Sequence, residues 1–203
     1  MKGGGALSQR PPACYCEAMR KGALHWHELD RTLVQRCGVF DLYRSRRRNG
    51  HREGDFHLLR ARDWANVVPV LEAGGRHERF VMVRQYRHGI DQVTVEFPAG
   101  LIELDEGPEA AAARELLEET GFRARRLVGL GAIVPNPAFM NNTCHSFCAE
   151  GLERVEELRL DELEVLEVLE VPLEELQRQI GQAPYVNSMT ALALFWYLRY
   201  RSA

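Results

Sequence analysis

The stretch GLIELDEGPEAAAARELLEETGF, which runs from Gly100 to Phe122, decides how the middle of the chain folds. It holds seven carboxylates and a single arginine in twenty-three residues. Like charges four residues apart on a helix repel each other by roughly a few tenths of a kcal/mol. A segment built for stability alone would interleave lysines, so the crowding predicts that this segment binds something positive.

Local signals predict a helix from Gly107 to Thr120. Pro108 suits the first helical turn, where its missing N–H group leaves no bond unmade. The alanine run at residues 110–113 has the highest helix propensity. Gly121 can take the left-handed conformation that commonly ends a helix.

Three carboxylates share one face of this helix, because Glu115, Glu118 and Glu119 have the spacing i, i+3 and i+4. A solvated helix face is the alternative, and it would suffice for a single pair of glutamates. Three carboxylates with no lysine among them favour a hard divalent cation such as Mg²⁺, which takes carboxylate and phosphate oxygens as ligands. We expect the opposite face to pack on a sheet, through Ala110, Ala113 and Leu117.

The flanking segments predict an α+β fold. Asn49–Gly50 is a strong hairpin signal between two strand-like runs. Strands are expected at residues 32–46, 54–61, 66–73, 79–87, 92–98, 126–134, 144–150 and 164–172, and helices at 172–181 and 188–201. We expect three parts: a flexible leader (1–31), an N-terminal extension of antiparallel strands (32–62) and the main domain (63–203).

Composition and charge argue against several classes of function. The formal net charge of −3 gives no reason to expect nucleic acid or an anionic membrane as a partner. An arginine cluster around Asn49–Gly50 suits either a nucleic-acid contact or a solvated hairpin tip. Five loosely spaced cysteines argue against a disulfide framework and against structural zinc. No apolar run reaches membrane-spanning length and no secretory signal is evident, so a cytoplasmic protein is expected.

One pattern unites these observations: Gly100, five residues, Glu106, seven residues, and then RELLEETGF from Arg114 to Phe122. This pattern resembles the signature of the Nudix hydrolases at every fixed position, namely Gly100, Glu106, Arg114, Glu115, Leu116, Glu118, Glu119, Gly121 and Phe122. The resemblance implies an α/β/α sandwich with a mixed sheet. It also implies metal-dependent cleavage of a nucleoside diphosphate that is linked to another moiety.

Segments outside that pattern look like the ADP-ribose pyrophosphatase branch of the family: residues 61–71, 83–89, 96–100, 136–150 and 161–176. The implied reaction is hydrolysis of the pyrophosphate bond of ADP-ribose or a related nucleoside diphosphate sugar. From ADP-ribose the products are AMP and ribose 5-phosphate. GDP-mannose, another sugar nucleotide or NADH is the alternative substrate. A non-catalytic module that senses nucleotides is the alternative from another class.

The resemblance also implies a metal site. Its cofactor is Mg²⁺, with Mn²⁺ as a substitute, and the metal lowers the pKa of a bound water and neutralises phosphate oxygens. Arg114 is expected to orient a carboxylate, and Glu106 to lie beside the metal site or to cap the helix. The implied ligands are the backbone carbonyl of Ala99 and the carboxylates of Glu115, Glu118 and Glu119, of which Glu115 and Glu119 also count as catalytic.

Further residues are assigned to the reaction and to the substrate. The general base of this branch follows the later strands, so Glu164 is the expected residue and Glu162 the alternative. Arg87 resembles an arginine that contacts substrate phosphates, a task that suits a bidentate guanidinium. The other expected substrate-binding residues are Arg84, Gly100 and Pro137, the last at a marker position of ADP-ribose hydrolases.

The implied partners follow from the same branch. Its members usually form homodimers in which N-terminal strands help to build the partner's substrate pocket. The region from Val34 to Arg60 is therefore the expected dimer element. The expected ligand is a small nucleoside diphosphate, and neither nucleic acid nor a membrane is expected as a partner.

Overall fold

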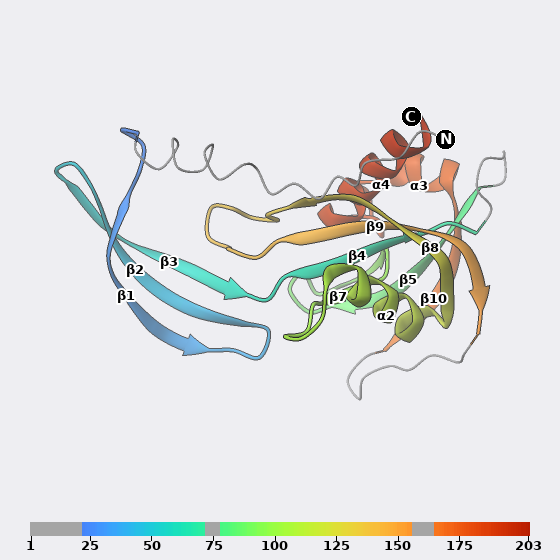
Figure 1. Cartoon of the computed structure of the whole chain (residues 1–203), viewed down its shortest axis with the longest axis horizontal. Coiled ribbons are helices and arrows are strands. Elements are labelled where there is room, and N and C mark those ends of the chain that lie inside the picture. Colours follow the sequence, from blue (N-terminus) through green and yellow to red (C-terminus); the bar gives the residue numbers. More distant parts are fainter. Residues whose placement is uncertain (1–21, 72–77, 156–164) are drawn as a thin grey trace. The chain divides into compact units, whose positions relative to one another are not determined.

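The structure, a computed structural model, describes residues 22–71, 78–155 and 165–203. The chain divides into two compact units (Figure 1). The N-terminal unit consists of Met1–Arg62 and Val134–Thr143, and the C-terminal unit consists of Asp63–Ile133 and Cys144–Ala203. The chain therefore leaves the C-terminal unit after Ile133 and returns to it at Cys144.

Three antiparallel strands form the sheet of the N-terminal unit in the order β1-β2-β3. They are β1 (His27–Arg36), β2 (Phe40–Asn49) and β3 (Arg52–Ala61). The φ angle of Gly50 is 57°, which confirms the hairpin signal between β2 and β3. β1 begins inside the expected leader, whereas residues 1–21 lie outside the described residues. The limits 1–31, 32–62 and 63–203 stay predictions.

Residues 134–143 belong to the N-terminal unit through hydrogen bonds to β3. The Leu59 N–H group donates to the Phe139 carbonyl at 2.7 Å. The Ala61 N–H group donates to Asn141 Oδ1 at 3.2 Å. The sheet gains little burial from its own strands, because Ser45 is the one buried residue within β1, β2 and β3.

Three of the four arginines of β2 are paired with carboxylates of the same sheet. Side chains alternate along a strand, so Arg46 and Arg48 lie on one face, where both bind Glu53. Arg47 lies on the other face and binds Glu28 at 3.1 Å. The guanidinium groups of Arg48 and Arg46 hold the pKa of Glu53 below its usual value. The pairing favours a solvated hairpin tip over a nucleic-acid contact.

The C-terminal unit contains a mixed four-stranded sheet in the order β7-β4-β9-β8. β4 and β9 run parallel and the other neighbours antiparallel, which confirms the expected mixed sheet. The strands are β4 (Trp64–Pro69), β7 (Ala99–Leu101), β8 (Phe122–Ile133) and β9 (Cys144–Arg154).

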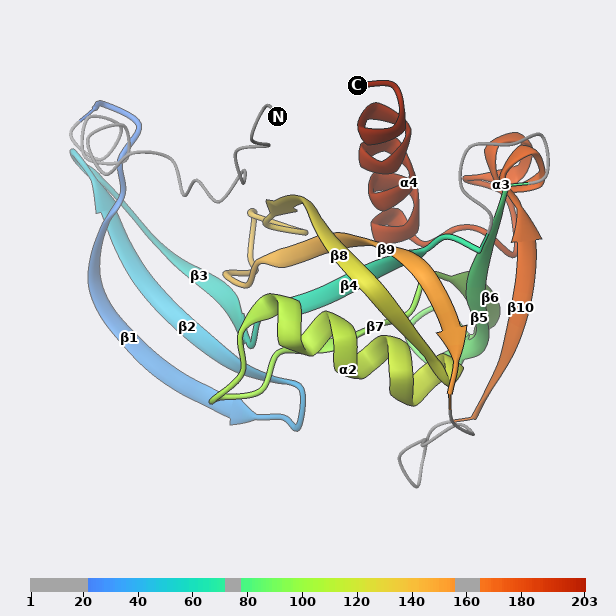
Figure 2. The same cartoon turned by 45° about the vertical axis from the view of Figure 1, so that its right-hand side comes forward.

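A second, antiparallel sheet of this unit has the order β10-β5-β6 (Figure 2). Its strands are β5 (Arg79–Arg87), β6 (Gln92–Glu96) and β10 (Leu166–Pro172). Two helices close the chain, α3 (Leu173–Gln179) and α4 (Ser188–Arg201). β5 and α4 have the bounds expected from the sequence. Within the described ranges, no helix is long and apolar enough to cross a bilayer.

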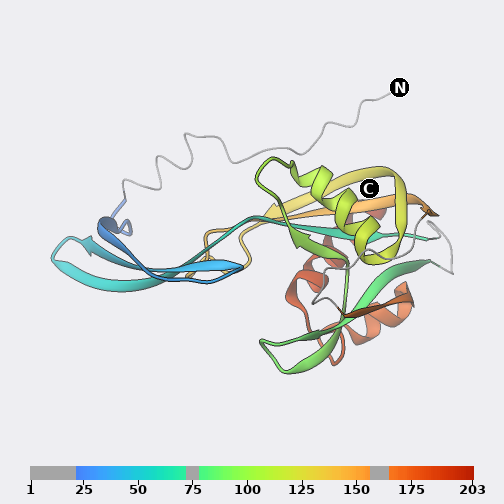
Figure 3. The same cartoon turned by 90° about the horizontal axis from the view of Figure 1, so that it is seen from below.

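The four-stranded sheet separates two hydrophobic cores. The helix α2 (Pro108–Thr120) covers one face, where Ala112 and Leu116 pack with Val67. α4 lies on the other face, where Leu194 packs with Val68 and the second sheet. Figure 3 shows α2 and α4 on opposite sides of the sheet. This arrangement confirms the α/β/α sandwich.

The borders of α2 confirm the helix signals, but its packing face was predicted wrongly. Gly107 precedes the helix and Gly121, with φ of 73°, ends it. Ala110 and Ala113 are exposed and Leu117 is only partly buried. The buried residues are Ala111, Ala112, Glu115, Leu116, Glu119 and Thr120. The prediction failed because it placed the packing face opposite the three carboxylates, whereas two of them lie on the buried side.

Candidate active site

Gly100 allows β7 to approach the buried side of α2. A Cβ atom at this position would overlap the carboxylate of Glu115. A larger residue here would force either β7 or the Glu115 carboxylate to move, so glycine is the residue that fits this arrangement unchanged. Glu115 is consequently 9% exposed and lies directly against the strand.

Ala99 links β7 to a second carboxylate of the helix. Its N–H group donates to Glu119 Oε2 at 3.1 Å, and Glu119 is 4% exposed. Glu118 lies further out, with its side chain 37% exposed. The short strand and one helix face therefore bring Ala99, Gly100 and the three glutamates together.

Arg114 connects the carboxylates of this region. Its Nη1 donates to Glu115 Oε1 at 2.7 Å and to Glu118 Oε2 at 2.9 Å. Its Nε and Nη2 each donate to the Glu106 carboxylate at 3.0 Å, and Nη2 also reaches the Leu101 carbonyl at 2.9 Å. These bonds, the one to Glu106 first, raise the pKa of Arg114, so its charge is permanent.

Glu106 pairs with Arg114 and does not cap the helix. No side chain forms a hydrogen bond that caps the first turn of α2. Its carboxylate instead accepts from Arg114 and from the Glu103 N–H group. The hydrogen bonds from Arg114 hold the pKa of Glu106 below its ordinary value. Of the two roles left open for Glu106, the one beside the carboxylate cluster therefore fits.

Residues 61–191 match the NUDIX domain family, which is more than half of the chain. The chain belongs to the Nudix family. It is 40% identical over 138 residues to an ADP-ribose pyrophosphatase of Bacillus subtilis (strain 168), covering 68% of this chain and 72% of the relative. It is 35% identical over 126 residues to a methanol dehydrogenase activator of Bacillus methanolicus, covering 62% and 68%.

A solved structure titled as an ADP compounds hydrolase has the same fold as this Nudix protein. Its TM-score is 0.77 at 23% sequence identity, and the match covers 87% of this chain and 94% of the other. At that identity the likeness establishes the fold alone. It agrees with the sandwich of α2, the mixed sheet and α4.

The carboxylates of this Nudix protein fit a hard divalent cation by chemistry. Glu115, Glu118 and Glu119 supply oxygen donors from one helix face, and Gly100 leaves the space that a Cβ atom would fill. They are not gathered around one point: across the described ranges, no group of three or more His, Cys, Asp or Glu side chains is arranged to hold a metal. Glu115 and Glu118 instead share Arg114, so metal binding requires these side chains to turn toward the ion.

Arg87 of this Nudix protein is held by a buried carboxylate. Its Nε donates to Glu96 Oε1 at 3.0 Å and its Nη2 to Oε2 at 2.7 Å. Glu96 is 2% exposed and also accepts from the Thr94 hydroxyl at 2.6 Å. Burial raises the pKa of Glu96, but the bonds from Arg87 and its other donors outweigh this effect, and the pKa lies below its usual value.

Arg84 and Arg87 lie on opposite faces of β5, since they are an odd number of residues apart in a regular strand. Arg84 is paired across the sheet with Glu167, and the side chains of both are largely exposed. A single ligand on one face of the sheet therefore meets one of the two arginines and not both.

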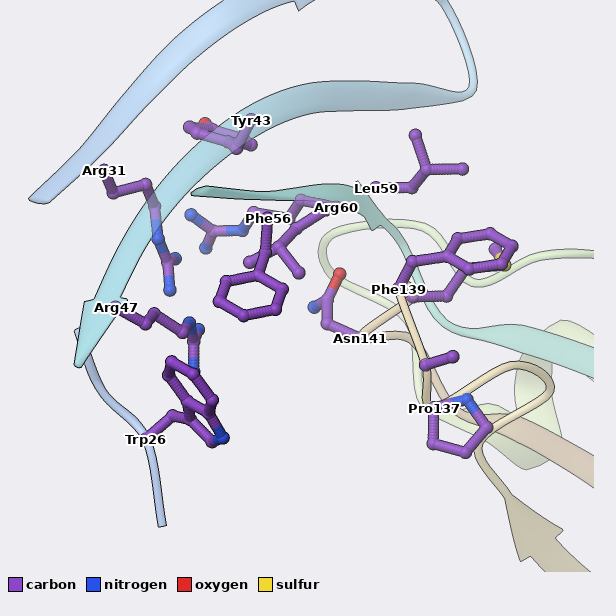
Figure 4. Close-up of a pocket in the computed structure, with 13 residues that line it drawn as sticks. Trp26, Arg31, Tyr43, Arg47, Phe56, Leu59, Arg60, Pro137, Phe139 and Asn141 are labelled. Carbon is purple, nitrogen blue, oxygen red and sulfur yellow. The ribbon is translucent and has the colours of Figure 1, made fainter. Parts of the chain in front are cut away.

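Pro137 lines a cavity of about 570 Å³ within the N-terminal unit (Figure 4). Trp26 and Phe56 meet there edge to face, with ring centroids 5.2 Å apart. Tyr43 and three arginines also line it, namely Arg31, Arg47 and Arg60. Sequence reasoning missed Trp26, which precedes β1 and was assigned to the leader.

The expected general base lies outside the described residues. Both Glu164 and its alternative Glu162 fall between residues 156 and 164. β10 starts soon after that stretch and pairs with β5, the strand of Arg87. The assignment of the base therefore stays a prediction.

Proposed function

We propose that this protein hydrolyses the pyrophosphate bond of ADP-ribose or a related nucleoside diphosphate sugar, with Mg²⁺ as cofactor. From ADP-ribose it releases AMP and ribose 5-phosphate. The observation that carries the proposal is the folded carboxylate cluster around Gly100 and Glu115. The likeness to an ADP-ribose pyrophosphatase, at 40% identity, supports the substrate class.

The carboxylates of α2 are the residues suited to hold Mg²⁺, or Mn²⁺ in its place. Glu115, Glu118, Glu119 and the carbonyl of Ala99 are the proposed ligands. When bound, the metal supplies positive charge to phosphate oxygens and lowers the pKa of a water. Arg114 keeps the carboxylates close together in the absence of the ion, because its guanidinium offsets their repulsion. Glu164, or Glu162, is the proposed base that takes the proton of the attacking water.

Arg87 is the proposed contact for the substrate's diphosphate. A guanidinium offers several donors in one plane and matches phosphate oxygens. Arg84 remains a weaker candidate, because its pairing with Glu167 lies on the other face of β5. Pro137 stays a proposed substrate contact; it lines the aromatic cavity of the N-terminal unit.

The protein is further proposed to act as a cytoplasmic homodimer. β1 is exposed along its whole length, and it forms one edge of its sheet. Leu29 and Val34 on this strand are 46% and 52% exposed. An edge strand with exposed apolar side chains is a surface that a second chain can cover.

The test is an assay of the purified protein with Mg²⁺ on ADP-ribose, GDP-mannose, UDP-glucose and NADH, with products separated by chromatography. Glu119→Gln serves as the inactive control. Release of AMP from ADP-ribose by the wild type, and its loss in the variant, supports the proposal. Faster cleavage of another compound would replace the substrate. Binding of ADP-ribose by calorimetry without any turnover would favour the nucleotide-sensing module.

A further inference from the structure

The β5–β6 hairpin places a chain of polar residues on one face. Val83 pairs with Glu96, Gln85 with Thr94 and Arg87 with Gln92, without any bulge. Because side chains alternate, Arg87, Thr94 and Glu96 share this face. The Arg87 side chain therefore runs diagonally past Thr94 to reach Glu96, with bonds of 3.0 and 2.7 Å.

The Glu96 carboxylate is surrounded by donors. Two come from Arg87 and one from the Thr94 hydroxyl, and the nearby Asn187 side chain also lowers its pKa. Asn187 in turn caps α4, accepting from the Met189 N–H group at 2.7 Å. A buried carboxylate with this many bonds has one orientation, and it imposes that orientation on its partners.

Arg87 itself is only partly buried. Its side chain is 40% exposed, whereas that of Glu96 is 3% exposed. One edge of the guanidinium is thus fixed against the protein while the side chain still meets solvent. A planar group fixed in this way loses little rotational freedom when an anion binds to it.

Glu96 also lies close to the carboxylate cluster along the chain. Ala99, whose N–H group binds Glu119, follows it by three residues. Three extended residues span at most about 11 Å. The anchor of Arg87 and the cluster around Gly100 are therefore carried by one short segment, which sets the distance between them.

We infer that Glu96 is a positioning residue: it fixes the Arg87 guanidinium in the orientation that receives the substrate's diphosphate. A carboxylate would repel that diphosphate on direct contact, so Glu96 acts through Arg87 and not on the substrate. The inference rests on the proposed function, in which Arg87 contacts phosphate. It adds the residue that makes this contact effective.

The experiment is a double-mutant cycle with Glu96→Gln and Arg87→Ala. Glu96→Gln keeps the shape of the side chain but removes its charge and one acceptor oxygen. Loss of a charged hydrogen bond weakens binding about tenfold, so we expect KM for ADP-ribose to rise about tenfold in either variant, with kcat changed less than about twofold. In the double variant KM rises no further, because both changes remove the same contact.

Inorganic pyrophosphate gives a readout that does not need turnover. Calorimetry should show the same loss of affinity in Glu96→Gln and in Arg87→Ala. If the wild type cleaves no substrate, the proposed function fails, and the pyrophosphate affinities still decide the role of Glu96. Glu170→Gln is the matched control, since it breaks the exposed pair with Arg79 on the same strand β5. It should change neither KM nor affinity.

Two outcomes overturn the inference. One is an unchanged KM and pyrophosphate affinity in a folded Glu96→Gln. The other is a double variant whose KM rises by the product of the two single effects, because independent losses would mean that Glu96 acts elsewhere. If Glu96→Gln does not fold, Thr94→Val decides: it removes the hydroxyl bond to Glu96 and should raise KM about two- to threefold. An unchanged KM in Thr94→Val would contradict the inference.

Discussion

At the scale of single residues, the site depends on one missing atom and one permanent charge. Gly100 has no Cβ atom, and that space is filled by the Glu115 carboxylate. Arg114 binds Glu115, Glu118 and Glu106 at once. A glycine and a bridging arginine thus set the spacing of the glutamates that are the proposed metal ligands.

Gly100→Ala should therefore disable the enzyme without unfolding it. The methyl group has to push β7 or Glu115 aside, and a displacement of about 1 Å at reacting groups costs roughly a hundredfold in rate. We expect kcat/KM for ADP-ribose to fall by about that factor and the Mg²⁺ requirement to rise. Gly107→Ala is the control, since a methyl group there meets nothing within 4 Å. Equal activities of the two variants would contradict the role of Gly100.

Glu96 should make the free energy of unfolding depend on pH. Its pKa is lowered in the folded protein, from the ordinary value of 4.5. Its contribution is fully present above that value and is lost as the pH falls through the lower, folded value. Urea unfolding should show the wild type losing stability between pH 5 and pH 3 more steeply than Glu96→Gln, which has no proton to gain. Parallel pH profiles would refute this prediction.

At the scale of elements, local signals predicted the ends of α2 but not the packing of its side chains. Pro108 and Gly121 gave the ends of α2, because their effects act within one turn. The packing face of α2 was not predictable from the sequence, because carboxylates usually face solvent and here Glu115 and Glu119 are buried. The Arg87–Glu96 ion pair was also not predictable from the sequence, since it depends on the register between β5 and β6.

The corrected packing face of α2 can be tested by comparing two adjacent leucines. Leu116 is 1% exposed in the core against the sheet, whereas Leu117 is only partly buried. Leu116→Ala should lower the free energy of unfolding by about 2–5 kcal/mol, and Leu117→Ala by clearly less. Chemical denaturation measures both. A larger loss for Leu117→Ala would restore the face first predicted from the sequence.

The strand β9 should protect its two thiols. Burial is the main cause that raises the pKa of Cys144 to about 12 and that of Cys148 to about 12. A thiol reacts as its thiolate, and the fraction ionised at pH 8 is on the order of one in ten thousand at such a pKa. Iodoacetamide should leave both unlabelled in the folded protein and label them in urea, as read by peptide mass spectrometry. Rapid labelling in the native state would contradict their burial.

At the scale of the whole molecule, the sequence predicted the family but not the full composition of the two units. The pattern from Gly100 to Phe122 indicated the family, because so many of its positions are fixed by chemistry. Membership of residues 134–143 in the N-terminal unit was not predicted, since it rests on bonds to Leu59 and Ala61 that are distant in sequence. Trp26 was missed for the same reason.

The proposed homodimer can be measured by light scattering after gel filtration. We expect twice the chain mass of 23.2 kDa. Val34→Arg places a charge on the exposed strand β1 and should shift the protein toward the single-chain mass. Val155→Arg, at an exposed valine that follows β9, is the matched control outside the region from Val34 to Arg60. A wild type at 23.2 kDa at all concentrations would remove the dimer from the proposal.

The interrupted N-terminal unit has a consequence during synthesis. Its three strands contain almost no buried residues of their own, and residues 134–143 complete it only after roughly seventy further residues have been made. At about 5–20 residues per second a ribosome needs about 4–14 s for that stretch. For those seconds the nascent sheet exposes Phe56 and Leu59 without their later neighbours. The first part of this chain to leave the ribosome is thus among the last to be finished.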